Sequence, residues 1–146
     1  MKVSDFKNAI WDYTRKISEN ANNAFNPICE RYGLTMMQVR ILVQLYQCGS
    51  HTVGSLADSM NAAGTNISSM CKKLESKDLL KRVRDQYDER VVKLTLTKTG
   101  EDVVLEIDKI LNEKISQQLK GESEETFDAI ILGLQKLNTL LERISN

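Results

Sequence analysis

The chain has 146 residues and a mass of 16.6 kDa, a length that can form one hydrophobic core without disulfides or metal ions. Apolar residues make up 41% of it and charged residues 27%, and its longest apolar run, residues 129–132, is far too short to span a bilayer. Because the N-terminus also lacks a basic segment followed by an apolar stretch, we expect a cytoplasmic protein without membrane partners.

Cysteine and histidine are too few for most metal sites and catalytic centres. Cys29, Cys48 and Cys71 have spacings that fit neither a CxxC pair nor a zinc site. His51 is the single histidine, so a Ser/His or Cys/His dyad could use only this residue. Glycine-rich phosphate-binding motifs are also missing. The sequence therefore predicts no metal, no cofactor and no enzymatic activity, and His51 is expected to be structural or exposed.

The formal net charge of zero hides an uneven distribution along the chain. Residues 34–100 carry 10 basic and 6 acidic side chains, a net charge of +4. Residues 101–146 carry 5 basic and 10 acidic side chains, a net charge of −5. A basic middle beside an acidic C-terminal part favours a surface for a polyanion, although solvated helices of different charge would give the same counts.

Apolar residues spaced by three and four positions predict a first helix over residues 4–31. Pro27 lies inside this pattern and is expected to kink or break the helix near Asn26. Gly33 is expected to end the segment. Cys29 lies near the end of the helix, where a thiolate at a dimer interface is one alternative to a buried structural thiol.

Three more helices follow in the first half. The second begins at Thr35, which can form a capping box with Gln38, and ends before Gly49. A short third helix begins after Thr52, and a fourth covers about 64–77. The inward side of the fourth helix is predicted to contain Ile67, Met70, Cys71 and Leu74. The other side contains Thr65, Asn66, Ser68, Ser69, Lys72 and Lys73. Cys48 and Cys71 are both expected to be small core residues.

After Leu79 the spacing of apolar residues changes from the three and four positions typical of a helix to the alternation typical of a strand. Residues 81–84 and 92–96 are predicted strands of a hairpin, joined by a charged turn at 85–89. A fifth helix is expected after Thr97, and a sixth from Ser123. The sixth contains an apolar seam with heptad-like spacing, which could pack within one chain or between two chains. The seam is formed by Phe127, Ile130, Leu134, Leu137, Leu141 and Ile144.

This order of elements predicts a winged helix-turn-helix, a mainly α fold with a small β-hairpin wing. A helix with a polar face fits the major groove, and a basic hairpin beside it can reach the DNA backbone or the minor groove. The polar face alone could be solvated surface, but the adjoining basic hairpin favours DNA.

The sequence resembles the MarR (multiple antibiotic resistance regulator) family of bacterial transcription factors over essentially its whole length. The resemblance rests on Tyr32-Gly33-Leu34-Thr35, Leu56-Ala57, Leu74-Glu75, Leu79-Leu80, the D-x-R signature Asp88-Glu89-Arg90, and the LxLTxxG exit Leu94-Thr95-Leu96-Thr97-Lys98-Thr99-Gly100. The order and spacing of these pieces is more specific than any one of them.

The resemblance implies a homodimer that binds a pseudo-palindromic operator in double-stranded DNA. It places the winged helix-turn-helix at residues 34–100 and interlocking dimerisation helices at residues 1–33 and 101–146. It implies DNA-reading positions at Thr65, Asn66, Ser68, Ser69 and Lys73 of the fourth helix, beside Lys72, and at Arg84, Asp88 and Arg90 of the wing. Family members often bind small aromatic acids between the dimer helices and the DNA-binding region.

Two positions depart from the family pattern. Ala63 stands where a capping serine is usual, so the fourth helix must begin with a weak cap or one from elsewhere. Ser69 stands where an arginine is common, which removes a strong guanine contact.

The sequence thus predicts a DNA-binding transcriptional repressor released by a small molecule or a redox signal. The alternative is a winged-helix protein-interaction module without DNA binding. An enzyme is disfavoured because no catalytic constellation is present.

Overall fold

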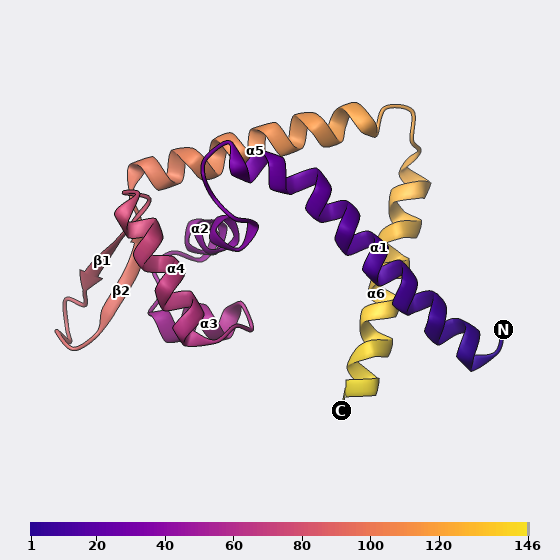
Figure 1. The fold of residues 1–146 in the computed structure, drawn as a ribbon, viewed down its shortest axis with the longest axis horizontal. Helices are drawn as coiled ribbons and strands as arrows, with labels where there is room; N and C mark the ends of the chain where they lie inside the picture. Colours follow the sequence, from indigo (N-terminus) through magenta and orange to yellow (C-terminus); the bar gives the residue numbers. More distant parts are fainter. Residues whose placement is uncertain (146) are drawn as a thin grey trace. The chain divides into compact units, whose positions relative to one another are not determined.

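A computed structural model describes residues 1–145, which form six α-helices and one hairpin of two strands (Figure 1). The elements are α1 (Val3–Glu30), α2 (Met36–Cys48), α3 (Val53–Ser59), α4 (Gly64–Ser76), β1 (Leu80–Arg84), β2 (Val92–Leu96), α5 (Lys98–Gln118) and α6 (Glu124–Ser145). The predicted mainly α fold with a β-hairpin wing is confirmed. None of the helices in this described part combines the length and apolar character needed to cross a membrane.

The chain divides into two compact units, Met1–Leu111 and Asn112–Asn146. The first contains α1 to α4, the hairpin and most of α5, and the second contains the end of α5 and α6. In the first unit, α2, α3, α4 and the hairpin surround a core of fully buried side chains. These are Ile41, Leu42, Leu56, Ile67, Cys71, Leu74, Leu80 and Leu94.

The predicted capping residues begin the helices as expected. Thr35 Oγ1 accepts the Gln38 N–H at 3.2 Å, and Gln38 Oε1 accepts the Thr35 N–H at 3.0 Å, which completes the capping box. Thr52 Oγ1 accepts the Ser55 N–H at 3.1 Å at the start of α3. Gly49 follows the last residue of α2 with a φ of +77°, a conformation that glycine adopts without strain.

Two expectations are wrong. The predicted break near Asn26 does not occur, because α1 continues past Pro27 to Glu30. A proline so close to the end of a helix removes a single backbone bond, and the buried Ile28 and Cys29 hold the last turn in the core. Cys71 is buried as predicted, but Cys48 is exposed at the last position of α2. It lies on nearly the same side of α2 as the buried Ile41 and Leu45, but in the exposed run of residues 46–50 at the end of the helix.

The hairpin pairs β1 and β2 in antiparallel register, with Leu80 opposite Leu96 and Arg84 opposite Val92. His51 adds a short bridge on the other side of β2 by exchanging backbone hydrogen bonds with Leu94. The Nδ1 atom of His51 lies 3.0 Å from Ser55 Oγ. His51 therefore has the structural role that was predicted, because it joins the start of α3 to the wing.

The beginning of α5 is tied closely to the end of α4. Thr97 Oγ1 donates to the Asp78 carbonyl at 2.6 Å and accepts the Gly100 N–H at 3.0 Å. A Cβ atom added at Gly100 would lie 1.9 Å from the Leu79 carbonyl oxygen. Only glycine allows this approach, which explains the glycine at the end of the LxLTxxG segment in physical terms.

We expect Gly100→Ala to lower the free energy of unfolding by about 2–3 kcal/mol, because a methyl group would overlap a backbone carbonyl that cannot rotate away. Chemical denaturation at fixed protein concentration measures this loss. Gly64→Ala is the matched control, since a Cβ there has no atom within 4 Å. Equal stability of the two variants would contradict the close approach of α5 to Leu79.

Candidate nucleic-acid interface

The two sides of α4 differ sharply in burial and chemistry. Ile67, Cys71 and Leu74 are fully buried, and Met70 is half-buried against the core. The opposite side carries the predicted DNA-reading residues: Thr65, Asn66, Ser69, Lys72 and Lys73 are exposed, and Ser68 is half-buried. The structure therefore brings these six side chains to one surface that offers hydroxyl, amide and ammonium groups.

The N-terminus of α4 is open. Ala63 precedes the helix and provides no side-chain cap, as the sequence indicated. The Ala63 carbonyl accepts the N–H groups of Asn66 and Ile67, both at 3.1 Å. The positive end of the helix dipole thus lies at the surface where Thr65 and Asn66 begin the polar face, an arrangement that favours an anion.

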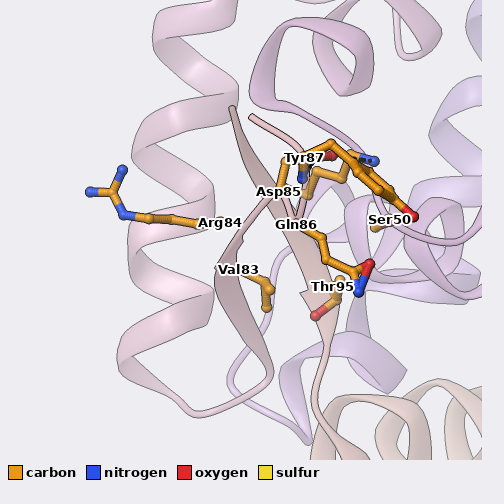
Figure 2. A pocket seen from close by; sticks show the side chains of 8 residues that line it. Ser50, Val83, Arg84, Asp85, Gln86, Tyr87 and Thr95 are labelled. Carbon is orange, nitrogen blue, oxygen red and sulfur yellow. Dashed lines mark hydrogen bonds and ion pairs between the residues drawn. The ribbon is translucent and has the colours of Figure 1, made fainter. Parts of the chain in front are cut away.

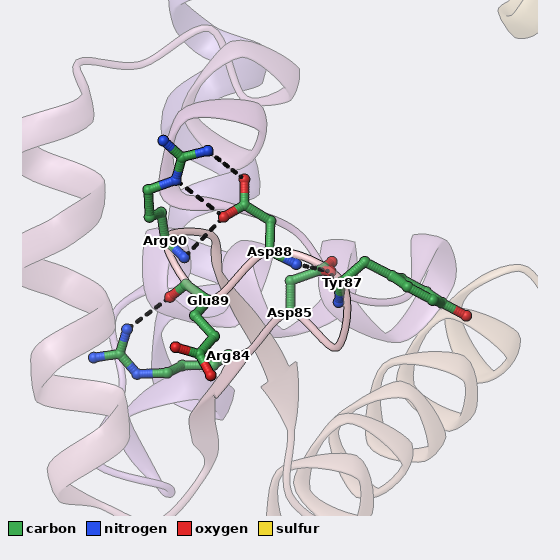
Figure 3. Close-up of polar contacts among 6 residues, drawn as sticks. All are labelled: Arg84, Asp85, Tyr87, Asp88, Glu89 and Arg90. Atoms are coloured by element: carbon green, nitrogen blue, oxygen red, sulfur yellow. Dashed lines mark hydrogen bonds and ion pairs between the residues drawn. The ribbon is translucent and has the colours of Figure 1, made fainter.

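The turn of the wing is organised by Asp85 (Figure 3). Asp85 Oδ1 accepts the Tyr87 N–H at 2.7 Å and the Asp88 N–H at 3.2 Å. Asp85 Oδ2 lies 3.1 Å from Lys93 Nζ. The backbone bonds to Tyr87 and Asp88 and the Lys93 side chain together lower the pKa of the Asp85 carboxyl, so this group is ionised at neutral pH.

The D-x-R pair lies next to this turn with the geometry that the motif predicts. Arg90 Nε donates to Asp88 Oδ1 at 3.2 Å, and the Arg90 backbone N–H donates to the same oxygen at 3.1 Å. The Arg90 side chain is still 92% exposed. Asp88 therefore orients the guanidinium without covering it. Arg84, the third predicted wing residue, donates from Nη1 to the Glu89 carbonyl at 2.7 Å.

Two contacts that shape the candidate interface were missed by the sequence analysis. Arg82 Nε donates to Glu75 Oε2 at 3.1 Å, which links β1 to α4. Sequence spacing cannot reveal this pair, because it depends on how the hairpin folds back onto the helix. The role of Asp85 could have been predicted from the sequence, because an aspartate at the first position of a turn often accepts backbone N–H groups of the next residues.

Comparison with known proteins decides the family. The sequence model of the family described as "Transcriptional regulator SarA/Rot" matches residues 23–107, which is more than half of the chain. The chain belongs to the SarA/Rot family of transcriptional regulators. The match covers α2 to β2 and therefore the whole winged helix-turn-helix of this SarA/Rot protein.

Individual relatives agree with this membership. The transcriptional repressor MdtR of Bacillus subtilis (strain 168) is 33% identical over 72 residues, which are 49% of this chain and 46% of that protein. The structure of a MarR family protein from Bacillus stearothermophilus matches 97% of this chain and 99% of its own, with a TM-score of 0.82 and 24% identity. A MepR mutant of S. aureus bound to an oligodeoxyribonucleotide matches 90% of this chain and 97% of its own, with a TM-score of 0.65 and 26% identity.

These findings confirm the resemblance to MarR-type regulators and the DNA-binding class of function. They also confirm that the SarA/Rot chain is a regulator and not an enzyme. The wing residues and the polar face of α4 are the candidate surfaces for DNA contact.

Proposed function

We propose that the protein is a homodimeric transcriptional repressor that places one α4 in each of two major grooves of a pseudo-palindromic operator. The observation that carries this proposal is the polar, exposed face of α4 next to a wing whose turn is already ordered. Side chains at the start of a helix can reach base edges, and a wing beside it can reach the neighbouring backbone. Residues 34–100 would form the DNA-binding region, and residues 1–33 and 101–146 the dimerisation region.

The proposed DNA contacts divide into two classes. Thr65, Asn66, Ser68 and Ser69 face outward on α4 and can read bases through hydrogen bonds. The second class meets phosphate or the minor groove and comprises Lys72, Lys73, Arg84 and Arg90, with Asp88 orienting Arg90. A bound dimer would block access to a promoter, and the relative MdtR is named a repressor, which supports repression over activation.

Asn66→Ala should weaken binding to the preferred operator by about 1–3 kcal/mol and change binding to scrambled duplex much less, because an amide can form two hydrogen bonds with adenine. The operator is first selected from a random duplex pool, and affinities are then measured for both duplexes. An equal loss of affinity for both duplexes would contradict base reading by α4.

Arg90→Ala is the matched comparison for the wing. It should weaken binding to every duplex by a similar factor, and it should lower the slope of log affinity against log salt by about one unit per lost phosphate contact. The dimer has two wings, so the loss doubles. An unchanged slope in a folded dimer would instead favour a protein-interaction module.

Dimerisation is supported by apolar side chains that the described chain leaves uncovered. No residue of α6 is buried, and the exposed large apolar residues of this helix are Ile130, Ile131, Leu132, Leu134, Leu141 and Ile144. In α1, Phe6, Tyr13 and Ile17 of the apolar stripe are also exposed. So much exposed apolar surface marks an interface, and a second copy of the same chain can cover it.

Light scattering at micromolar concentration should give about twice the mass of 16.6 kDa. Leu134→Glu should shift the protein toward the monomer mass, because it places a charge on the α6 seam. Gln135→Glu adds the same charge at the next position, which points about 100° away around the helix, and should leave the dimer intact. A wild-type monomer, or dissociation by both variants alike, would contradict this interface.

A cavity of about 110 Å³ lies where the end of α1 meets α2 and α5. Its lining is Phe25, Ile28, Cys29, Met36, Val39, Arg40, Ile107 and Leu111. The volume approaches the roughly 150 Å³ of a cavity that binds benzene, so it suits one aromatic ring. Arg40 is exposed and can pair with a carboxylate. These features support release of DNA by a small aromatic acid.

A redox release through Cys29 has less support. This side chain is 5% exposed, and burial raises the pKa of its thiol. A thiol with a raised pKa is mainly protonated at neutral pH and reacts slowly with peroxide. We therefore assign Cys29 a packing role in the cavity wall.

Salicylate, as a probe of this cavity, should raise the apparent Kd for the operator at least about fivefold at saturation, in the range of ordinary allosteric coupling. Arg40→Gln should remove most of this response and leave the affinity without salicylate unchanged. Benzyl alcohol, which has a ring but no carboxylate, is the control ligand. Release that persists at full size in Arg40→Gln would contradict recognition of the acid by this residue.

A further inference from the structure

We propose that the wing has a second DNA-backbone site, a hollow on its outer face that takes one sugar–phosphate unit of the strand opposite to the one contacted by Arg90. This inference rests on the DNA-binding function proposed above and extends it to residues that the D-x-R motif does not include. Lys93 would meet the phosphate, Tyr87 would pack on the sugar, and Asp85 would be the positioning residue for both.

The hairpin register defines this outer face. Leu80 and Leu94 are buried, so the residues that alternate with them point away from the core. On that side Val83 stands opposite Lys93, and Lys81 stands opposite Thr95. The wing thus has a core-facing side, where Arg82 pairs with Glu75 of α4, and a separate outer side.

A hollow of about 350 Å³ lies on the outer side, with the tip of the wing as one wall (Figure 2). It is lined by Ser50 from the loop before α3, by Val83 and Arg84 of β1, by Asp85, Gln86 and Tyr87 of the turn, and by Lys93 and Thr95 of β2. Figure 2 shows the guanidinium of Arg84 pointing away from it. The hydroxyl of Thr95 is buried without a hydrogen-bond partner among the described residues.

Lys93 is the more exposed member of the ion pair that lines the hollow. Lys93 Nζ lies 3.1 Å from Asp85 Oδ2, but the lysine side chain is 43% exposed and the aspartate side chain only 17%. The Lys93 side chain is therefore more accessible to an approaching phosphate than the Asp85 carboxylate is. Asp85 uses its other oxygen for the Tyr87 and Asp88 N–H groups, so it fixes Lys93 and the backbone of Tyr87 at once.

The two sides of the wing tip carry different side chains. Figure 3 shows the Tyr87 ring on the opposite side of the turn from Arg84 and Arg90. The Tyr87 side chain is 94% exposed, although its backbone is held by Asp85. A minor groove is about 6 Å wide, so a hairpin tip that enters it has one strand's backbone on each side.

The chemistry of the hollow matches a sugar–phosphate unit. Phosphate oxygens accept from the Lys93 ammonium and from the Ser50 and Tyr87 hydroxyls. The Tyr87 ring and Val83 offer apolar surface to deoxyribose. A neutral small molecule or a partner protein could pack on the Tyr87 ring without needing the Lys93 ammonium group. The experiment distinguishes these occupants from a sugar–phosphate unit.

The test replaces single phosphates of a selected operator duplex by neutral methylphosphonates, one position at a time on each strand. For the wild type, we expect about fivefold weaker binding at one minor-groove phosphate of each strand in each half-site. Lys93→Met should abolish the effect on one strand only, and Arg90→Ala should abolish it on the other strand only.

Lys81→Met is the matched control, because it removes the same charge from the same face outside the hollow. Asp85→Asn keeps an acceptor for the Tyr87 and Asp88 N–H groups but loses the ion pair. Asp85→Asn should reproduce the methylphosphonate profile of Lys93→Met and leave the Arg90-dependent strand unchanged. General destabilisation of the wing would instead affect both strands.

Circular dichroism and light scattering confirm that each variant folds and keeps its assembly. The inference is overturned if Lys93→Met costs no more affinity than Lys81→Met and leaves the methylphosphonate profile of both strands unchanged. If operator binding still depends on Asn66 in that case, the proposed function stands and only this inference fails. Failure of the wild type to bind any duplex would overturn the function and the inference together.

Discussion

Burial of one face of α4 is the constraint on which the proposed DNA interface depends. Ile67, Cys71 and Leu74 have no exposed surface, and each fully buried aliphatic side chain contributes about 1.5–3 kcal/mol of transfer free energy. A rotation of α4 about its axis would expose them, so the helix has one stable orientation. The outward direction of Asn66, Ser69 and Lys73 follows from that orientation. The interface is therefore determined by apolar packing on the far side of the helix, not by the polar residues themselves.

The wing relies on a different kind of interaction, because an isolated two-stranded hairpin has little core of its own. Polar contacts replace packing there. Asp85 closes the turn, Asp88 fixes Arg90, and the Arg82–Glu75 pair connects β1 with α4. Exposed ion pairs contribute only about 0–1 kcal/mol each to stability. In the wing these contacts act by restricting its conformation. Because the short turn is already ordered, less conformational entropy is lost when the wing binds.

The sequence predicted those features that depend on neighbouring residues. The capping box of Thr35 and Gln38, the cap at Thr52 and the inward side of α4 all follow from local spacing, and the structure confirms them. Features that depend on strand register were not predictable. The Asp85–Lys93 and Glu75–Arg82 pairs join residues whose distance is set by how the hairpin folds back. The cavity lined by Cys29, Arg40 and Ile107 likewise required the packing of three helices that are distant in sequence.

The contacts at the end of α4 suggest how an occupied cavity would reach the DNA interface. Lys77 Nζ donates to the Gly33 carbonyl, just after the last turn of α1. Thr97 donates to the Asp78 carbonyl and begins α5. The first link joins α4 to the end of α1, and the second joins it to the start of α5. Both α1 and α5 line the cavity, through Ile28 and Ile107 respectively. A ligand that pushes α1 and α5 apart would therefore pull on both connections at the C-terminal end of α4. Because the buried side of α4 allows no rotation without loss of packing, the helix would move as a rigid body. In the proposed homodimer, its spacing from the second α4 would then change.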